Sequence, residues 1–566
     1  MTPKKGMYGC GALMLALGVA AIVEPLPGKP AAAPKFAVTT YHYDNLRTGW
    51  NSHERVLTPS AIASPRNALV KFARLAVVRL DDTVYAQPLV MPDVNIASGN
   101  FMGQHDVVYV VTENNSVYAI DADNGTVLLT RNLGPAVPRT VCGNNGPRVG
   151  IESTPVIDTA ARTLYLMSYQ LQQGQPAYVL YGLDLATLEV TKSRTVTASH
   201  PLTDGSTYHF DPAAQRQRAA LLLEDGNIYA AFTSFCDHRD GIPHARGWVL
   251  GWRAADLQQL TPSILTNRLP DSYLSSIWMS GYGVAAIAGH LYFATGNPEP
   301  TSPSTYNNPN NLSESVIKVS ADLTQILDFF TPSNVGALDA NDNDLGSGGV
   351  MIVPDQPSAI PRMAVAAGKE GKMYLLNRTA LGGFNANRNG VGGPYAIGSC
   401  YCGQSYYLNK IVSSGGSEVG VWQINTSPAT GLTKIQSASL DIDGIGSKGD
   451  GFFTAVSSNG NAGAIIWAVS QRENSRGAPH FPRLFAFQPV AGNAVLQPLL
   501  AETDPATQIT RKSMVAGRWD WPALGGEGGH SNIVPVVANG HVYVASYTEL
   551  DIFGFTTPVF EASSHK

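Results

Sequence analysis

Side chains that could act on a ligand gather in the middle of the sequence, between residues 278 and 369. Trp278 offers an aromatic plate, and the turn Thr295-Gly296-Asn297 adds polar groups. Residues 339–344 carry aspartate at the first, fourth and last positions, which mimics a calcium loop because Ca²⁺ prefers oxygen ligands. Lys369 follows in the run Ala-Ala-Gly-Lys-Glu-Gly. Such a set favours an enzyme over a passive scaffold, provided that the fold brings its members together.

Each member of this set also has an ordinary structural explanation. The acidic segment departs from the EF-hand pattern, because Asp344 stands where that pattern needs Gly and Val350 where it needs Glu. The segment could instead be a solvated acidic loop. In the same way, Trp278 could pack between blades, residues 295–297 could form a strand-ending turn, and Lys369 could occupy a plain turn position.

Other reactive motifs are scarce in the sequence. The stretch from Cys236 to His244 mixes side chains that can bind metals, but its spacing matches no zinc signature, which favours a loop. The sequence has no Gly-x-Ser-x-Gly elbow and no phosphate-binding loop. It also lacks Cys-x-x-Cys-His, so this chain attaches no c-type haem.

The residues between the aromatic plate and the polar turn predict a β-hairpin. Residues 284–287 and 290–294 are short apolar runs, and Ala288-Gly289 lies between them. Two such runs separated by a glycine-containing turn are typical of antiparallel strands. Along the sequence, Trp278 precedes this hairpin and Asn297 follows it.

Further copies of this hairpin predict an all-β propeller. An opening strand that often holds a proline is followed by a strand with an apolar-Tyr pair and by two more strands. Four-stranded units that recur at roughly 55–65 residues are typical of a β-propeller. We expect eight blades, with seven as the alternative because the unit near residues 408–440 is weak. The opening strands are expected near residues 84, 151, 217, 281, 348, 408, 452 and 531.

The first residues of the predicted propeller have a part in its closure. Residues 72–80 alternate enough to be a strand, and the last unit has little chain left for a fourth strand. We therefore expect residues 72–80 to supply that strand and close the ring, which removes open sheet edges. Residues 36–41 are predicted as another strand, and residues 43–51 as an ordered loop.

The N-terminus predicts export. Lys4-Lys5 precedes an apolar stretch at residues 11–23, which is too short to span a bilayer comfortably. We expect a signal peptide and tether at residues 1–33 and a single propeller domain at residues 34–566, in a periplasmic or secreted protein with no membrane span in the mature chain. An uncleaved anchor is the alternative.

Charge and cysteine content narrow the possible partners. The formal net charge is -5, charged residues make up 14%, and no Lys/Arg-rich run appears, so we expect no nucleic-acid partner. Export would leave four cysteines, which an oxidising compartment could pair in three ways or leave as free thiols. They are Cys142, Cys236, Cys400 and Cys402, and the first two lie in loops of nearby units and could be bridged.

The sequence resembles the pyrroloquinoline quinone (PQQ) dehydrogenase propellers, which are eight-bladed oxidoreductases of alcohols and sugars. It is more similar still to a group of secreted PQQ-like propellers whose activity the family name does not settle. The resemblance covers most of the mature chain as a weak repeat, and it is specific between residues 278 and 344. The matching features, in the family's order, are Trp278, Thr295-Gly296-Asn297-Pro298-Glu299-Pro300, Thr331-Pro332 and Asp339-Ala-Asn-Asp342-Asn-Asp344.

The resemblance implies a role for each of these residues. Trp278 would be the plate on which the quinone stacks, and Lys369 the basic residue beside the quinone oxygens. Asn297 would bind Ca²⁺ through its amide oxygen. Asp344 or Asp342 would take the proton of the substrate hydroxyl as general base, and would also serve as a Ca²⁺ ligand. The reaction would be hydride transfer from an alcohol or sugar carbon to the quinone, with an external electron acceptor.

The chain departs from the family in two places. The family's alcohol dehydrogenases carry two adjacent cysteines over the quinone, whereas Cys400-Tyr-Cys402 is spaced and lies in another blade. The family's Ca²⁺-binding glutamate has no clear match, so Asp237 or Asp240 would have to replace it as a metal ligand.

These departures leave a second hypothesis, a propeller that binds a partner and has no cofactor. An enzyme is expected to gather Trp278, Asn297, Lys369 and one of Asp342 or Asp344 around one central pocket. A scaffold would instead have a solvent-filled channel there and an apolar patch on a rim.

Overall fold

The computed structural model describes residues 1–2, 6, 34–63, 70–138, 147–235, 237, 244–300, 309–385, 389–440, 451–470, 481–503, 508–517 and 533–556. The chain divides into two compact units, Met1–Lys35 and Phe36–Lys566. Every strand and helix of the described residues belongs to the second unit. None of the helices among these residues is long and apolar enough to cross a membrane.

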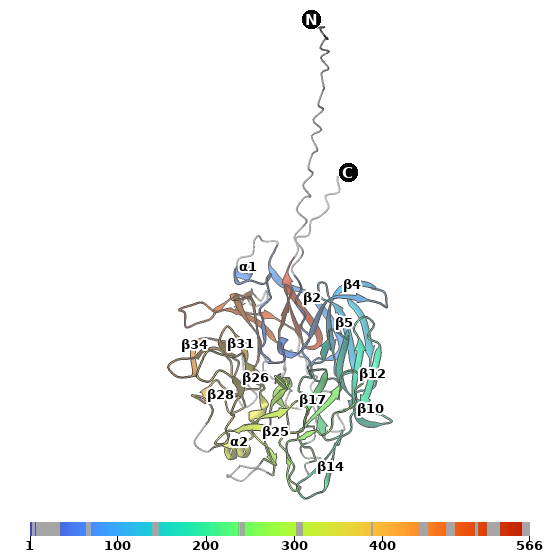
Figure 1. Ribbon diagram of the computed structural model, residues 1–566, viewed down its shortest axis with the longest axis vertical. Coiled ribbons are helices and arrows are strands. Elements are labelled where there is room, and N and C mark those ends of the chain that lie inside the picture. Colours follow the sequence, from blue (N-terminus) through green and yellow to red (C-terminus); the bar gives the residue numbers. More distant parts are fainter. Residues whose placement is uncertain are drawn as a thin grey trace. The chain divides into compact units, whose positions relative to one another are not determined.

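Eight antiparallel sheets, counted over the described residues, form the blades of a β-propeller, and they follow one another in chain order from blue to red (Figure 1). Blade 1 is β3 (Leu89–Ile96), β4 (Gly103–Val111), β5 (Ser116–Asp121) and β6 (Val127–Asn132). Blade 2 is β9 (Val156–Asp158), β10 (Thr163–Gln172), β11 (Gln175–Asp184) and β12 (Val190–Thr195). Blade 3 is β16 (Leu222–Glu224), β17 (Asn227–Ser234), β18 (Trp248–Arg253) and β19 (Ile264–Leu265), with β15 (Gln215–Arg216) also paired to β17.

The second half of the ring repeats this pattern. Blade 4 is β21 (Ala285–Ile287), β22 (His290–Ala294), β24 (Val316–Ser320) and β25 (Ile326–Thr331), with β29 (Gly383–Phe384) added in parallel. Blade 5 is β26 (Val350–Val353), β27 (Met363–Ala367), β28 (Lys372–Asn377) and β30 (Tyr395–Ala396). Blade 6 is β31 (Ser405–Tyr407), β32 (Lys410–Ser413), β33 (Glu418–Asn425) and β34 (Gly431–Ser439). Blade 7 is β35 (Phe453–Asn459), β36 (Ala462–Val469), β37 (Arg483–Gln488) and β38 (Gln497–Pro498), joined by β1 (Trp50–Asn51) and β41 (Met514–Val515).

Blade 8 closes the ring with strands from both ends of the chain. It consists of β42 (Val536–Ala538), β43 (His541–Ala545), β44 (Tyr547–Phe555) and β2 (Phe72–Thr83), which lies beside the red strands in Figure 1. The register pairs Phe72 with Phe555 and Val78 with Leu550. The predicted closure by residues 72–80 is therefore confirmed, and so are the all-β class and the count of eight blades rather than seven.

Short elements connect the blades. The helical turns are η1 (Tyr41–Tyr43), α1 (Pro59–Ala63), η3 (Met279–Gly281), α2 (Val335–Asn341) and η4 (Leu345–Ser347). Four small ribbons pair β7 (Val137–Pro138) with β8 (Arg148–Val149), β13 (Ser199–Pro201) with β14 (Thr207–His209), β20 (Tyr273–Leu274) with β23 (Pro298–Glu299), and β39 (Glu502–Thr503) with β40 (Thr510–Arg511).

The hairpin predicted from the apolar runs is the first hairpin of blade 4. β21 and β22 pair with Ala285 opposite Tyr292 and Ile287 opposite His290. The turn residues Ala288 and Gly289 both have positive φ, 51° and 73°. Two consecutive positive φ values give the primed turn whose twist matches that of paired strands.

The segment of residues 38–51, here called the central plug, is bonded to all eight blades. Its backbone carbonyls or amides pair with the first strand of most blades: Val38 with Val90, Thr39 with Ile157, Asn45 with Ala286, Leu46 with Ile352, Thr48 with Tyr406 and Gly49 with Val456. The side chain of Asn45 reaches Leu223 in blade 3, and that of Asn51 reaches Val537 in blade 8. A segment that touches the first strand of every blade must lie on the propeller axis. Residues 38–41 therefore belong to this plug, and the prediction of residues 36–41 as a strand was wrong.

Arg47 holds the central plug to the blades around it. Its side chain is fully buried, and its guanidinium donates to Val284 O (2.8 Å and 3.0 Å), Leu221 O (3.3 Å) and Tyr41 O (3.0 Å). Tyr282 donates its hydroxyl hydrogen bond to Arg47 O at 2.7 Å. The plug is thus an ordered part of the core, fixed mainly by backbone groups.

Candidate functional site

The ion pair between Asp344 and Lys369 is the centre of the candidate site. Both side chains are buried, and the Lys369 ammonium donates to one carboxylate oxygen of Asp344. The backbone N–H of Asn297 donates to the other oxygen at 3.1 Å. Burial alone would lower the Lys369 pKa, but the Asp344 carboxylate overcomes this and holds that pKa above its usual range. Lys369 is therefore a permanent cation beside the Asp344 carboxylate.

Asp342 belongs to the same group but is placed differently. It caps the C-terminus of α2 in the left-handed conformation, with φ 50°, and its carboxylate lies 2.9 Å from Lys369 Nζ. Its side chain is 62% exposed, against 9% for Asp344. Of the two predicted bases, Asp344 is the one held rigidly, because it has two fixed donors.

Glu314 is an acidic residue beside Asp344 that the sequence reasoning missed. It is fully buried, and its Oε2 accepts a hydrogen bond from Leu345 N at 2.6 Å. Burial raises the pKa of Glu314 well above its usual range, and the neighbouring carboxylates of Asp344 and Asp339 raise it further. The only signal was an acid between two serines directly before the buried strand β24, and such a position resembles many polar strand starts.

Two glycines let the backbone close around Asp344. A Cβ on Gly368 would collide with the carbonyl oxygen of Asp344, and a Cβ on Gly296 would lie 3.0 Å from Asp344 Oδ1. The first collision involves backbone atoms, which cannot yield as a flexible side chain can. Gly296 of the Thr-Gly-Asn turn and Gly368 before Lys369 therefore leave the space that Asp344 occupies.

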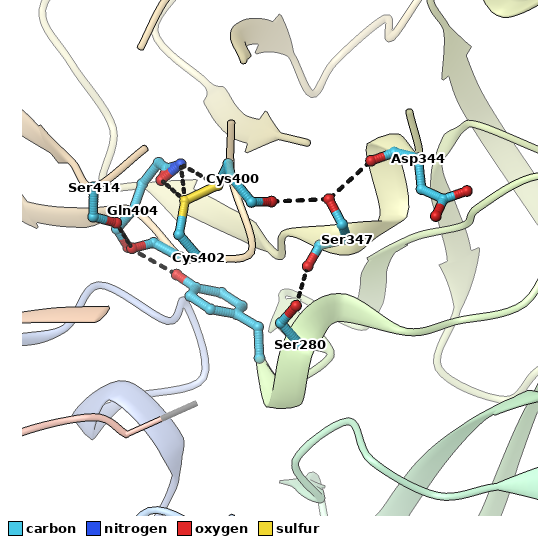
Figure 2. The surroundings of a disulfide bond; sticks show 9 residues. Ser280, Asp344, Ser347, Cys400, Cys402, Gln404 and Ser414 are labelled. Carbon is cyan, nitrogen blue, oxygen red and sulfur yellow. Dashed lines mark hydrogen bonds between the residues drawn. A yellow bond between two sulfur atoms is a disulfide. The ribbon is translucent and has the colours of Figure 1, made fainter. Parts of the chain in front are cut away.

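A disulfide borders the same loop, as Figure 2 shows. Cys400 and Cys402 are bonded to each other, and Ser347 Oγ lies 2.8 Å from Cys400 O and 2.9 Å from Asp344 O. The ring of Tyr401, between the cysteines, lies 5.5 Å from Lys369 Nζ. The spaced cysteine pair, which the sequence placed in another blade, thus reaches the candidate site through space. Cys142 and Cys236 lie outside the described residues.

Trp278 lies on the blade-3 side of the site. It is half-buried and precedes η3, whose Ser280 hydroxyl donates to Ser347 O in the turn after Asp344 (Figure 2). The guanidinium carbon of Arg216 lies 5.8 Å from the Trp278 ring centre. The structure therefore connects the aromatic plate to the Asp344 turn through η3 and η4, and adds an arginine to it.

Arg216 is part of a buried ionic cluster that sequence reasoning also missed. It forms a two-pronged pair with Glu152, at 2.7 Å from its Nε, and the pair is buried. Burial alone would lower the Arg216 pKa, but Glu152 raises it above its usual range. Burial raises the pKa of neighbouring Glu113, and the Glu152 carboxylate adds to this. These charges come from blades 1, 2 and 3, so the packing of consecutive blades brings them together.

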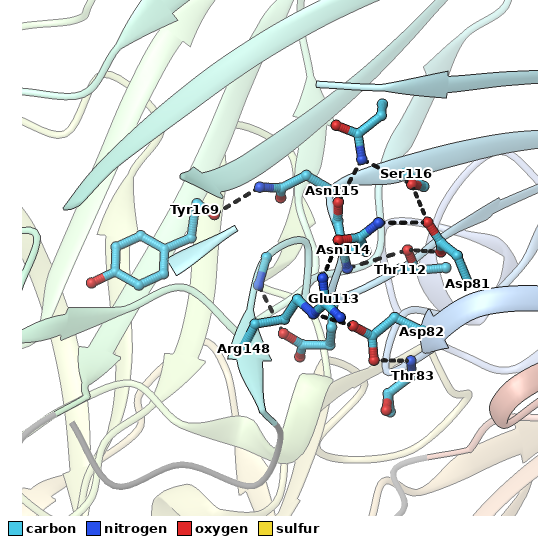
Figure 3. Close-up of polar contacts among 12 residues, drawn as sticks. Asp81, Asp82, Thr83, Thr112, Glu113, Asn114, Asn115, Ser116, Arg148 and Tyr169 are labelled. Atoms are coloured by element: carbon cyan, nitrogen blue, oxygen red, sulfur yellow. Dashed lines mark hydrogen bonds and ion pairs between the residues drawn. The ribbon is translucent and has the colours of Figure 1, made fainter. Parts of the chain in front are cut away.

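A surface network holds the turn that carries Glu113, as Figure 3 shows. Asp81 accepts hydrogen bonds from Thr112 (2.8 Å), Asn114 (2.7 Å) and Ser116. Glu113 itself accepts from Gly150 N at 2.8 Å. The network fixes the β4–β5 turn, and the bond from Gly150 N fixes the Glu113 carboxylate.

The predicted residues are brought together in part. Asp344, Asp342, Lys369 and the backbone of Asn297 form one group, and Trp278 is linked to it by the η3–η4 contact. Asp237 is exposed at the end of blade 3's β17, where Ser234 donates to it. Within the described part of the chain, no three His, Cys, Asp or Glu side chains are grouped so that they could hold a metal ion.

Comparisons with known proteins add fold-level information. No protein-family model and no curated protein sequence matches the chain. Among solved structures, it is similar to the quinohemoprotein alcohol dehydrogenase of Comamonas testosteroni, with a TM-score of 0.54, 13% identity and coverage of 92% of this chain and 80% of that one. A structure described as a europium-containing methanol dehydrogenase matches with a TM-score of 0.53, 9% identity and coverage of 92% and 98%. Quinohemoprotein alcohol dehydrogenase ADHIIG of Pseudomonas putida HK5 matches with a TM-score of 0.50, 11% identity and coverage of 92% and 80%. At these identities the chain shares the eight-bladed propeller fold of the PQQ-type dehydrogenases, and its site must be judged on its own residues.

Proposed function

We propose that the chain is an exported quinoprotein dehydrogenase that binds PQQ and Ca²⁺ and oxidises an alcohol or a sugar, with an external electron acceptor. The observation that carries the proposal is the buried Asp344–Lys369 pair connected to Trp278 through η3 and η4. A rigid carboxylate near an aromatic plate is suited to take a hydroxyl proton beside a planar cofactor.

The chemistry of PQQ suits the side chains around this site. PQQ is planar and carries several carboxylates, so it needs an aromatic face and positive charge. Trp278 offers the face, and Arg216 and Lys369 are the cations of the site, each of which also pairs with a carboxylate of the chain. Buried polar atoms without hydrogen-bond partners among the described residues lie at the same ends of blades 1 to 4: Glu113 Oε1, Ser153 Oγ, Gln215 Oε1 and Nε2, Gln217 Oε1 and Ser276 Oγ. Such atoms are costly unless a ligand or water pairs with them.

The chain's own residues would divide the work as follows. Bound PQQ would supply the two-electron acceptor for the hydride. Asp344 would accept the hydroxyl proton, because Lys369 and the Asn297 N–H hold its carboxylate in a fixed orientation. Glu314, whose pKa is raised by burial, would remain protonated beneath Asp344 and leave the negative charge on the outer carboxylate.

The described residues around Asp344 supply only part of a Ca²⁺ ligand set. Asp344, Glu314 and the Asn297 amide are oxygen donors of the type that Ca²⁺ prefers, but Ca²⁺ takes six to eight such ligands. Both oxygens of Asp344 already accept hydrogen bonds, one of them from a cation. We therefore assign no step to the metal and test its binding separately.

A titration of the purified protein with PQQ, with and without Ca²⁺, tests the proposal through tryptophan fluorescence and absorbance. We expect saturable PQQ binding that is lost in Trp278→Ala and weakened in Lys369→Met. Asn297→Ala should affect only a Ca²⁺-dependent part of the binding. Asp256→Asn, in an exposed ion pair on blade 3, is the control and should bind like the unmodified protein.

Two results would count against the proposal. If PQQ fails to bind at high micromolar concentration, the dehydrogenase hypothesis is wrong and a propeller that binds another partner remains. If PQQ binds equally well to Trp278→Ala, a quinone site exists elsewhere and the assignment of this site is wrong.

A further inference from the structure

A groove between blades 6 and 7 lies away from the candidate site. Its volume is about 640 Å³, within the range of sites for small organic ligands. Among its lining residues are Leu408 of blade 6 and Asn461 of blade 7, which lie in the turns between the first and second strands of those blades. Asp344 and Cys400 precede the first strands of their blades. The groove and the candidate site are therefore at opposite ends of the blade strands.

The walls of the groove are mainly apolar. Ile435 of β34 faces Pro489, Val490 and Ala491 of blade 7 across it, and Ala464 and Ala494 add further apolar surface. Ile435 is 37% exposed, and Val495, next to the lining residues, is 67% exposed. Large apolar side chains that remain open to solvent beside a concave surface are typical of a binding site.

The groove is preformed because blade 6 holds the blade-7 loop in place. Gln436 Nε2 donates to Val490 O at 2.6 Å and to Asn493 O at 2.9 Å. Ser437 N donates to Ala494 O at 3.0 Å, and Leu496 N donates back to Ser437 O at 3.0 Å. A ligand would therefore meet a fixed wall and would not have to order a loop.

Lys410 is the one charged side chain among the lining residues, and no carboxylate accompanies it there. Its ammonium lies 3.2 Å from Leu408 O, 3.4 Å from Asn409 Oδ1 and 5.5 Å from the ring centre of Tyr407. Burial lowers the pKa of Lys410, with no acidic partner to offset this effect. Tyr407 also lines the groove, and its buried hydroxyl has no hydrogen-bond partner among the described residues. A half-buried cation without a counter-charge and an unpaired hydroxyl complement an anionic oxygen ligand.

We propose that this groove binds a small organic monoanion, a carboxylate joined to an apolar chain or ring. The carboxylate would pair with Lys410, and the apolar part would lie against Ile435, Val490 and Ala494. This site is independent of the proposed quinone site, since the two share no residue.

Calorimetric titration of the full chain with octanoate, and with octanol as the neutral analogue, tests the proposal. We expect saturable octanoate binding that Lys410→Met weakens about fivefold or more, because a partly desolvated ion pair is lost. Octanol should bind more weakly than octanoate and should not respond to Lys410→Met. Lys434→Met is the matched control: Lys434 lies in the same blade, over Trp422 and paired with Glu418, and its loss should leave octanoate binding unchanged.

A blocking variant locates the binding and covers the case in which Lys410→Met is unstable. Ala464→Phe places a ring in the groove and should abolish octanoate binding while PQQ binding persists. The proposal is overturned if octanoate does not saturate, if it binds equally well to Ala464→Phe, or if octanol binds as tightly as octanoate. Failure of PQQ to bind would not affect it.

Discussion

Replacement of Arg47 by methionine tests whether the central plug is held by hydrogen bonds from this one side chain. The guanidinium donates to three buried carbonyl oxygens, those of Tyr41, Leu221 and Val284. It also donates to the Thr40 hydroxyl at 2.7 Å and to the part-buried Asp44 O at 3.4 Å, and these two weaker losses are left out of the sum. A buried acceptor left unsatisfied costs about 2 kcal/mol, so the loss is about 6 kcal/mol. Burial lowers the pKa of Arg47 to about 10, which means that the buried charge itself costs about 3 kcal/mol, and methionine recovers this. The net expected loss of stability is about 3 kcal/mol.

The melting temperature and hydrogen exchange measure this loss. For 566 residues the unfolding entropy is about 1.2 kcal/mol per kelvin, so Arg47→Met should lower the melting temperature by about 3 °C. Hydrogen exchange should accelerate first in residues 38–51, because the plug loses its anchor while the blades keep their strand pairs. Arg253→Met removes an exposed ion pair with Asp256 and should change the melting temperature by less than about 1 °C.

An unchanged melting temperature together with unchanged exchange in residues 38–51 would refute this reasoning. The backbone bonds of the plug to the blades would then be sufficient by themselves. A fall in melting temperature with exchange spread evenly over all blades would also contradict it, because the loss would not be local to the plug.

Three further predictions follow from the buried groups. Burial lowers the pKa of His42 from 6.5 to about 3, so its contribution to stability is present above pH 6.5 and is lost as the pH falls toward 3. The loss of stability is about 2 kcal/mol by pH 5. In urea unfolding, the stability of His42→Asn should therefore fall less steeply with acid than that of the unmodified protein, whereas the same change at exposed His53 should have no such effect. Gly368→Ala should lower stability by about 1–3 kcal/mol in urea unfolding, because its Cβ meets the Asp344 carbonyl, and a neutral result would mean that the loop can relax. Lys369→Met should lower the free energy of unfolding by about 3–5 kcal/mol, because it leaves a buried carboxylate unpaired, and adding Asp344→Asn should restore most of this loss. A double variant no more stable than Lys369→Met in urea unfolding would contradict the ion-pair account.

The sequence could point only to those candidate residues whose type and position at a strand end or turn are distinctive. Trp278, Asn297, Asp344 and Lys369 stand at strand ends and turns and have distinctive residue types, so the sequence could single them out as candidates. Glu152 and Arg216 were not, because each is a single charge in an otherwise ordinary segment. Their pairing depends on the contact between blades 2 and 3, which the sequence does not record.

The central plug is the clearest difference between prediction and structure. Residues 36–41 have the composition of a strand, and the prediction followed that local preference. On the propeller axis residues 36–41 do not run beside any one strand. Val38 bridges Val90 of blade 1, Thr39 O accepts from Ile157 N of blade 2, and the rest of the plug continues to the next blades. This tertiary environment overrides the local preference of the residues.

The sequence by itself determined the all-β class, the repeat of four-stranded units and the closure by residues 72–80, and the structure decided the count of eight blades over seven. These depend on alternation, glycine turns and apolar runs, which act over a few residues and can be seen along the chain. Tertiary structure decided which charges meet. The pairs Asp344–Lys369 and Glu152–Arg216, and the approach of the Cys400–Cys402 disulfide to Asp344, join residues that are far apart in sequence or lie on different blades. The first pair depends on how the turns at one end of blade 5 fold together, and the other two contacts depend on how neighbouring blades pack, and no local pattern of residues contains that information.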